Sequence, residues 1–186
     1  PVATKPTQQT IINDWAKEMG DKYENIIPFG SVHPFAEDVF EELQRIKEMG
    51  LYGVKLHPDY QEFFIDDEKV FPVYEKCAEL SLPVVFHAGW DPLSPDLVHA
   101  PPKASRKAHD AVPQMTMVLA HMGGMKHWEE VLEQRAREKA KLAEVDDIEI
   151  KRNFYILSGM LLPALGQVYI QSAKITDVRH ACRRVY

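Results

Sequence analysis

Residues 83–89 read Pro-Val-Val-Phe-His-Ala-Gly, an apolar run that ends in His87 and is followed by two small residues. Residues 117–124 repeat the design as Met-Val-Leu-Ala-His-Met-Gly-Gly, which places His121 directly after an apolar run. A third run, residues 53–58, ends in His57 and a proline. A buried parallel strand has this appearance when it delivers a polar group to the carboxyl-terminal mouth of a (β/α)₈ barrel. The three runs therefore predict an active-site face.

Helical spacing of apolar residues alternates with these strands along the chain. It predicts helices over residues 10–20, around 39–46, around 70–80, and over 103–111 and 128–143, with Gly20 and Gly50 as stops. In the first helix four apolar residues share a face: Ile11, Ile12, Trp15 and Met19. Further strands over 26–32 and 153–157 bring the total to about five, all parallel. This α/β order predicts a (β/α)₈ TIM-barrel type fold. Because such a barrel needs about 250 residues and the chain has 186, we expect it to be incomplete.

The composition of the chain limits the classes of partner that it is expected to bind. The chain is 45% hydrophobic and 27% charged, as an ordinary soluble protein is. Its net charge of −6, without a basic stripe, argues against nucleic acid or an anionic membrane as partner. No signal peptide, membrane-spanning stretch or disulfide framework is recognisable. We therefore expect a cytoplasmic protein with one domain over residues 1–186, an atypical tail over 166–186, and a homo-oligomer as an open option.

Two histidines carry the chemistry. Neutral imidazole is a common ligand of zinc, and the strand before His87 would hold it rigidly, with small residues after it leaving room for an ion. His121 could bind a metal, or it could take a proton from a metal-bound water. Each could instead be a buried core histidine. Their matching flanks on successive strands favour a functional site with a small-molecule substrate.

Lys55 and His57 alternate with apolar residues, so they point to the same side of their strand. A bare lysine inside a barrel is costly unless it is paired. Lys55 could bind a substrate carboxylate, become a metal-bridging modified lysine, form a Schiff base in a metal-free aldolase, or reach solvent. Trp90 and Asp91 follow the His87 strand directly and could shape the pocket. Three other histidines are expected at the surface: His99, His109 and His127.

These motifs resemble the amidohydrolase superfamily, and in particular the amidohydrolase-related branch that includes aminocarboxymuconate semialdehyde decarboxylase. The resemblance covers roughly residues 10–160 and rests on residues 30–34, 53–58, 85–89 and 119–124. It implies a (β/α)₈ barrel with a divalent metal at the carboxyl-terminal face, usually zinc, with manganese as the alternative. It also implies that His87 is a metal ligand and that His121 is the catalytic group beside a metal-bound water.

The chain departs from the family at both ends. The family carries a His-x-His pair on its first strand, and this sequence contains no such pair, so we expect the first strand to be lacking. The family also has an aspartate ligand after its eighth strand. Only Asp177 falls at a suitable distance, and it is the candidate second metal ligand. The chain is therefore either a piece of a longer barrel or a member with altered ends.

The resemblance implies a metal-dependent hydrolase or decarboxylase that acts through a metal-activated water. The expected substrate is a small organic acid or a cyclic amide or ester, and Lys55, His57 and Trp90 would line its pocket. The alternative is a non-catalytic incomplete barrel that serves as a binding or assembly subunit.

Overall fold

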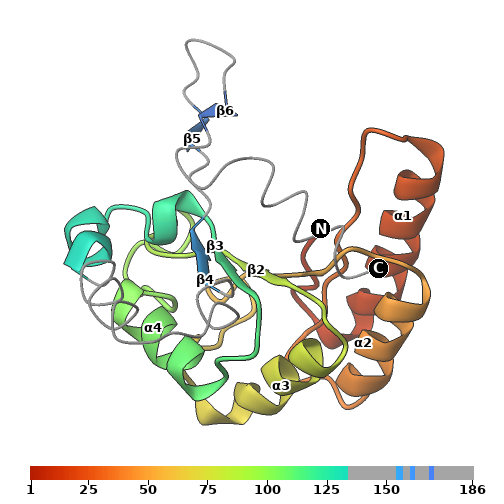
Figure 1. Ribbon diagram of the computed structural model, residues 1–186, viewed down its shortest axis with the longest axis horizontal. Helices are drawn as coiled ribbons and strands as arrows, with labels where there is room; N and C mark the ends of the chain where they lie inside the picture. The colour runs from red at the N-terminus through yellow and green to blue at the C-terminus, as the bar shows by residue number, and fades with distance from the viewer. Residues whose placement is uncertain (134–153, 157–159, 162–167, 170–186) are drawn as a thin grey trace, which may run out of the picture.

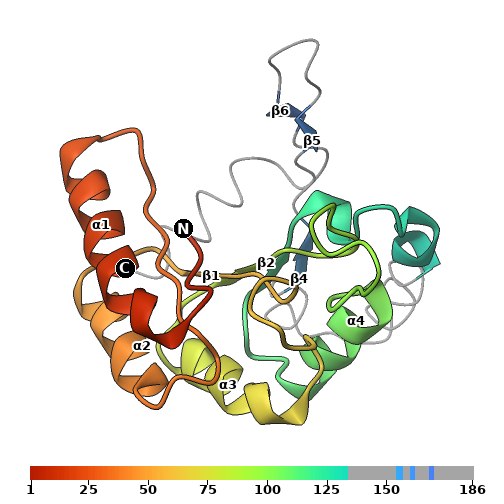
Figure 2. The same cartoon turned by 180° about the vertical axis from the view of Figure 1, so that it is seen from behind.

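A parallel sheet in the order β1-β2-β3-β4 forms the centre of the structure, a computed structural model that describes residues 1–133, 154–156, 160–161 and 168–169. Figures 1 and 2 show helices arranged around the outside of this sheet. In chain order the central elements are α2 (Val39–Glu48), β1 (Val54–Leu56), α3 (Phe71–Glu79), β2 (Val84–Phe86), α4 (Pro102–Ala111), β3 (Met117–Leu119) and β4 (Phe154–Ile156).

Shorter elements flank this core. The antiparallel pair β5 and β6 stands apart from the main sheet. These elements, together with the first long helix, are η1 (Pro6–Gln8), α1 (Gln9–Lys22), η2 (Glu68–Val70), η3 (His121–Gly123), β5 (Met160–Leu161) and β6 (Val168–Tyr169).

The two faces of the sheet differ in burial. Val54, Leu56 and Phe86 are fully buried, and Phe86 meets the edge of Tyr74 from α3 at a ring-centroid distance of 5.4 Å, so this is the helix side. The alternate residues Lys55 and Val85, which lie opposite each other in the β1–β2 register, are only partly buried. Because side chains alternate along a strand, the partly buried face is the one that lines the interior of a barrel.

The predicted alternation of strands and helices is confirmed, and so is the stop at Gly50, whose φ of +72° is the left-handed conformation that glycine adopts easily. The stop at Gly20 is wrong, because α1 continues to Lys22. A Cβ on Gly20 would lie 2.4 Å from the ring of Pro28, so this glycine permits close approach of the next segment.

The strand predicted over residues 26–32 is reduced to one bridge between Gly30 and Val54. Pro28 has no backbone N–H to contribute to a ladder. This segment extends the parallel arrangement beyond β1 through that single bridge.

The apolar face predicted for the first helix is also not the face that is buried. Ile11 is 73% exposed and Trp15 is 53% exposed. The inward positions include Asn13, whose Nδ2 donates to the carbonyl of Ser31 at 2.9 Å and to Glu42 Oε1 at 2.6 Å. A buried polar network, rather than an apolar seam, fastens α1 to the segment before β1.

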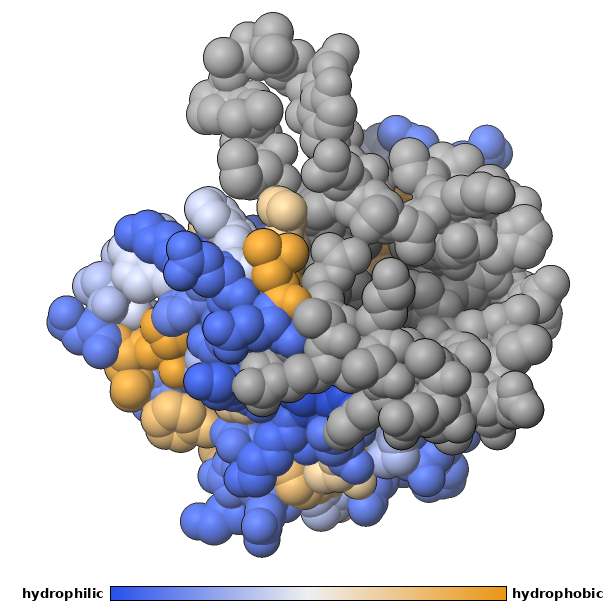
Figure 3. Space-filling view, turned by 60° about the vertical axis from the view of Figure 1, so that its left-hand side comes forward, coloured by the Kyte–Doolittle hydropathy of each residue, from blue (hydrophilic) through white to orange (hydrophobic). Residues whose placement is uncertain are grey.

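The last predicted helix begins at Trp128 and is helical through residue 133, where the description of this part of the chain stops. Among the described helices, none has the length and apolarity needed to cross a lipid bilayer. On the face shown in Figure 3, the described surface is mostly hydrophilic and its apolar patches are separate.

Candidate active site

His87 and His121 meet at the carboxyl ends of β2 and β3. The parallel register pairs Phe86 with Leu119, so the residues that follow each strand emerge side by side. Nε2 of His121 lies 3.1 Å from Nδ1 of His87, within hydrogen-bonding distance. The structure thus brings together the two imidazoles that the sequence singled out.

The backbone after β3 turns sharply to make this contact. His121 and Met122 both have positive φ, at +56° and +60°. For residues other than glycine this conformation costs about 1–3 kcal/mol each and persists only where the surroundings enforce it. Gly89 is part of those surroundings: a Cβ there would lie 2.1 Å from the nitrogen of Met125, and the nitrogen of Trp90 donates to the carbonyl of Met125 at 3.0 Å. The loops after β2 and β3 are therefore tied together beneath the two histidines.

Three aromatic rings form a stack beside them. Tyr60 lies flat on His57, with centroids 3.7 Å apart and an interplanar angle of 3°. His57 lies in turn on His87, at 4.1 Å and 11°. His57 and His87 are each less than 10% exposed, so both faces of the His57 ring are covered.

Asp91 completes the cluster from the loop after β2. Its Oδ1 accepts hydrogen bonds from the Tyr60 hydroxyl at 3.1 Å and from the Leu93 nitrogen at 2.8 Å. Its Oδ2 lies 3.7 Å from Nε2 of His57 and 3.7 Å from Nε2 of His87. Possible ligand atoms of His57, His87 and Asp91 all lie within 4.8 Å of one another, so the cluster could hold a divalent cation.

Burial keeps the two stacked histidines neutral. Removal from water, reinforced by the neighbouring charge of His87, lowers the pKa of His57 to about 3. Removal from water is also the main cause that lowers the pKa of His87, and the nearby charge of His121 is the second cause. Neutral imidazole is the form that binds metal. His87 Nε2 is buried without a hydrogen-bond partner, which is costly unless something else satisfies that atom. The residues present therefore fit a divalent cation.

Lys55 places a cation on the inner face of the sheet. Burial alone lowers the pKa of its amine to about 8. Its charge is one reason why the pKa values of His57 and His87 are lowered, so the amine lies near the histidines. In the part of the chain that the structure describes, no carboxylate lies within ion-pairing distance of Lys55.

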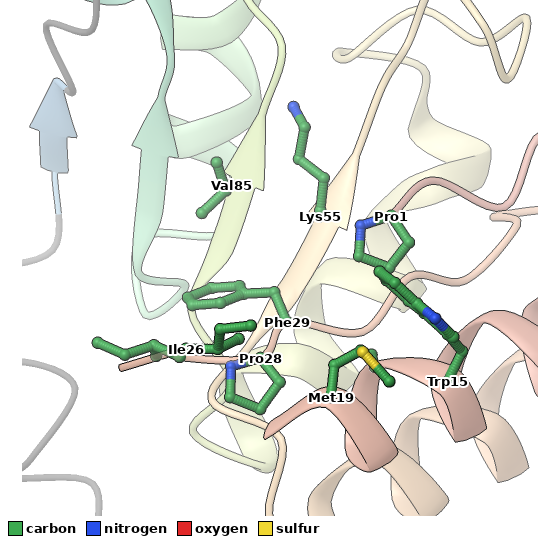
Figure 4. A pocket seen from close by; sticks show the side chains of 10 residues that line it. Pro1, Trp15, Met19, Ile26, Pro28, Phe29, Lys55 and Val85 are labelled. Atoms are coloured by element: carbon green, nitrogen blue, oxygen red, sulfur yellow. The ribbon is translucent and has the colours of Figure 1, made fainter. Parts of the chain in front are cut away.

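An apolar cavity of about 430 Å³ lies at the other end of the sheet. Figure 4 shows the Lys55 amine pointing away from the residues at its floor, including Pro28, Phe29 and Met19. Since barrel active sites form at the carboxyl ends of the strands, this cavity, which α1 residues such as Trp15 and Met19 help to line, is not the candidate active site.

The remaining predicted site residues are not all in the cluster. Trp90 is half-buried, and the amine of Lys126 lies 3.1 Å from the centre of its ring. Asp177 lies outside the described residues. The prediction that His99 and His109 lie at the surface is wrong, since these residues are only 9% and 4% exposed.

The sequence placed Asp91 only near the pocket and not among the possible cation ligands, and it missed Tyr60 and the buried pair of His99 with Asp59. His99 Nδ1 lies 3.1 Å from Asp59 Oδ1. The available signal was spacing: Tyr60 follows His57 by three positions, and Asp91 follows His87 by four. Polar residues so soon after a strand end fall in the loops that surround the site.

Comparisons with known proteins agree with this geometry. The family model described as amidohydrolase matches residues 1–150. No curated protein matches the chain.

Among solved structures, an uncharacterized TIM-barrel protein from Bordetella bronchiseptica is 21% identical with a TM-score of 0.61, over 79% of this chain and 48% of that one. The 4-oxalomesaconate hydratase from Rhodopseudomonas palustris is 19% identical with a TM-score of 0.57, over 97% and 71%. The 5-carboxyvanillate decarboxylase from Novosphingobium aromaticivorans, solved with manganese and 3-methoxy-4-hydroxy-5-nitrobenzoic acid, is 19% identical with a TM-score of 0.54, over 82% and 52%. This likeness shows a TIM-barrel type fold, and the chain spans about half the length of most of these structures.

Proposed function

Because the chain belongs to the amidohydrolase family, whose model matches residues 1–150, we propose that it carries the active site of a metal-dependent hydrolase or decarboxylase. The proposed substrate is a small organic acid or a cyclic amide or ester. The proposed cation is zinc, with manganese as the alternative that the decarboxylase from Novosphingobium aromaticivorans supports. The observation that carries the proposal is the contact of His87 with His121, which leaves His87 Nε2 buried and unpartnered.

His87 is the first ligand in this proposal. In the tautomer in which His87 donates its Nδ1 proton to His121 Nε2, the lone pair of His87 Nε2 is free for a cation. Metal-binding histidines usually donate their other ring N–H in this manner, which fixes the ring. A divalent cation at such a site supplies Lewis-acid polarisation and a water whose pKa is lowered to about 7.

His121 is the proposed acid–base group. Its ring is held by His87 on one side and by the strained turn of η3 behind it. A general base must lie within hydrogen-bond reach of the proton it moves. Because Nε2 of His121 accepts the proton of His87 Nδ1 in this arrangement, the nitrogen of His121 that would take up a proton is Nδ1. Asp177 stays a proposed further ligand from outside the described residues.

Lys55 is the proposed anchor for a substrate carboxylate. It is the cation near the histidines, it is partly buried, and within the described residues it has no carboxylate partner. An anionic substrate would supply that partner. Trp90 is proposed to line the pocket, and His57, whose two ring faces are covered, can offer a substrate only its edge.

The test uses the 186-residue chain, stripped of metal and reloaded with Zn²⁺ or Mn²⁺. Release of carbon dioxide from hydroxybenzoic acids and hydrolysis of cyclic amides and lactones are measured for the unaltered chain, His87→Ala and His121→Asn. His127→Asn is the control, because that half-buried histidine lies outside the cluster. We expect metal-dependent turnover that both cluster variants lose and the control keeps. A loaded chain that turns over none of these compounds would refute the enzyme and favour the binding subunit.

A further inference from the structure

Asp91 presents one fixed and one free oxygen to the histidines. We infer that Asp91 is a ligand of the cation held by His87, and that Tyr60 is the residue that positions it. The inference rests on the metal dependence of the proposed function, but it concerns how the cation is bound rather than which reaction follows.

The distance between Asp91 Oδ2 and His87 Nε2 is the first reason for this inference. At 3.7 Å the two atoms are too far apart for a hydrogen bond, and His87 Nε2 has no other partner. Two ligands of one tetrahedral zinc ion, each about 2.0–2.2 Å from it, lie about 3.3–3.6 Å apart. The gap is close to that required for a shared ion.

Hydrogen bonds fix the orientation of the Asp91 carboxylate, which is the second reason. Two donors, the Tyr60 hydroxyl and the Leu93 nitrogen, bind Oδ1, so the carboxylate cannot rotate without losing them. Oδ2 is thereby directed at the histidine edge of the cluster. Partners of this kind orient a ligand before the cation arrives, and their loss typically weakens metal binding 10- to 100-fold.

The ring stack decides the part played by His57. A cation lies close to the plane of an imidazole that ligates it, because the nitrogen lone pair lies in that plane. The planes of His57 and His87 are nearly parallel, at 11° with centroids 4.1 Å apart, so one ion cannot lie in both. His57 is therefore a spacer, clamped between Tyr60 and His87, that holds the ligating ring in place.

Tyr60 acts in two separable ways. Its ring presses His57 against His87, and its hydroxyl holds Asp91. Tyr60→Phe keeps the ring and removes only the hydroxyl, while His57→Phe keeps a stacked ring and removes both nitrogens.

The experiment measures the dissociation constant of Mn²⁺ by calorimetry on the metal-stripped full chain, with no assay of turnover. Asp96→Asn is the matched control, because it is the same change at an exposed position of the same loop. We expect Asp91→Asn to weaken binding at least 100-fold, Tyr60→Phe to weaken it 10- to 100-fold, and His57→Phe and Asp96→Asn to change it less than threefold. Thermal unfolding without metal checks that each variant folds, and Tyr60→Phe carries the test should Asp91→Asn fail to fold.

Three outcomes would overturn the inference. The first is that Asp91→Asn and Tyr60→Phe bind Mn²⁺ with wild-type affinity while His87→Ala binds none. The second is that His57→Phe loses as much Mn²⁺ affinity as Asp91→Asn. The third is that the unaltered chain does not bind Mn²⁺. Because turnover is not measured, the proposed reaction can fail while this assignment stands. Equally, a metal-dependent reaction can be found in a chain whose Asp91 is not a ligand.

Discussion

Replacing Lys55 with methionine should make the folded chain more stable at neutral pH. Burial lowers the pKa of the amine from 10.5 to about 8, so at pH 7 it is charged in both the folded and the unfolded chain. Each pKa unit corresponds to about 1.4 kcal/mol. The pKa gap of roughly 2.5 therefore gives a cost to the folded state of about 3.5 kcal/mol, which methionine removes.

The sign of the pH dependence follows from the same values. Between pH 8 and 10.5 the unfolded chain holds the Lys55 proton and the folded chain does not, so the free energy of unfolding rises with pH. The advantage of Lys55→Met should therefore shrink by about 2 kcal/mol between pH 7 and pH 9.5. Because both proteins contain Cys77 and Tyr74, the titration of those groups cancels in the difference.

The assay is urea unfolding of both proteins at each pH in the presence of a chelator, which removes any cation near the amine. Lys69→Met, at an exposed position, is the control and should show no such pH-dependent gain. Benzoate should raise the melting temperature of the unaltered chain and not that of Lys55→Met. A stability difference that stays constant from pH 7 to 9.5, or a Lys55→Met chain less stable at both values, would refute the idea of an unpaired, desolvated amine.

Three further predictions concern the scaffold. Gly89→Ala should lower the free energy of unfolding by at least about 2 kcal/mol, because the new Cβ would meet Met125 in a left-handed backbone; wild-type urea stability would contradict the proposed tie between the two loops. Burial lowers the pKa of His109 to about 4, so acidification from pH 7 to 4.5 protonates only the unfolded form and should cost roughly 2 kcal/mol; His109→Gln should lose this share, and equal acid sensitivity in both proteins would count against it. Burial raises the pKa of the Cys77 thiol to about 12, so in a Cys182→Ser background a thiol-reactive disulfide should label the chain at pH 8 only at the rate of unfolding, and rapid labelling of the folded chain would disprove this.

The sequence predicted the parts of the fold that depend on local periodicity. The runs that end at His57, His87 and His121 became parallel strands in register, because short, mostly apolar runs of this kind are typical of strands in a covered parallel sheet. It failed where burial depends on distant partners. Asn13 is buried because Ser31 and Glu42 satisfy its side chain, while Trp15 on the same helix stays exposed. No periodicity of the helix itself contains that information.

The candidate site likewise contains some residues that local sequence patterns predicted and others that they did not. Strand ends could be read from the chain, so His87 and His121 were found. Asp91 and Tyr60 could not be assigned, because their roles arise only when the loops after β1 and β2 meet and a carboxylate oxygen is held by a hydroxyl from another segment. His99 was expected at the surface for a related reason: its partner, Asp59, lies 40 positions earlier in the chain.

The cation cluster is built from strand–loop units that follow one another in the chain, whereas enclosure of the substrate pocket depends on more distant strands. Tyr60, His57, His87 and Asp91 come from two successive strand–loop units, and His121 from the next, so adjacent strands in parallel register are enough to assemble them. Lys55 differs, because it lies on the sheet face that lines a barrel interior, where enclosure depends on strands from the opposite wall. Metal affinity should therefore respond to changes in the loops after β1 and β2. Substrate affinity should respond to whatever covers the face that carries Lys55 and Val85.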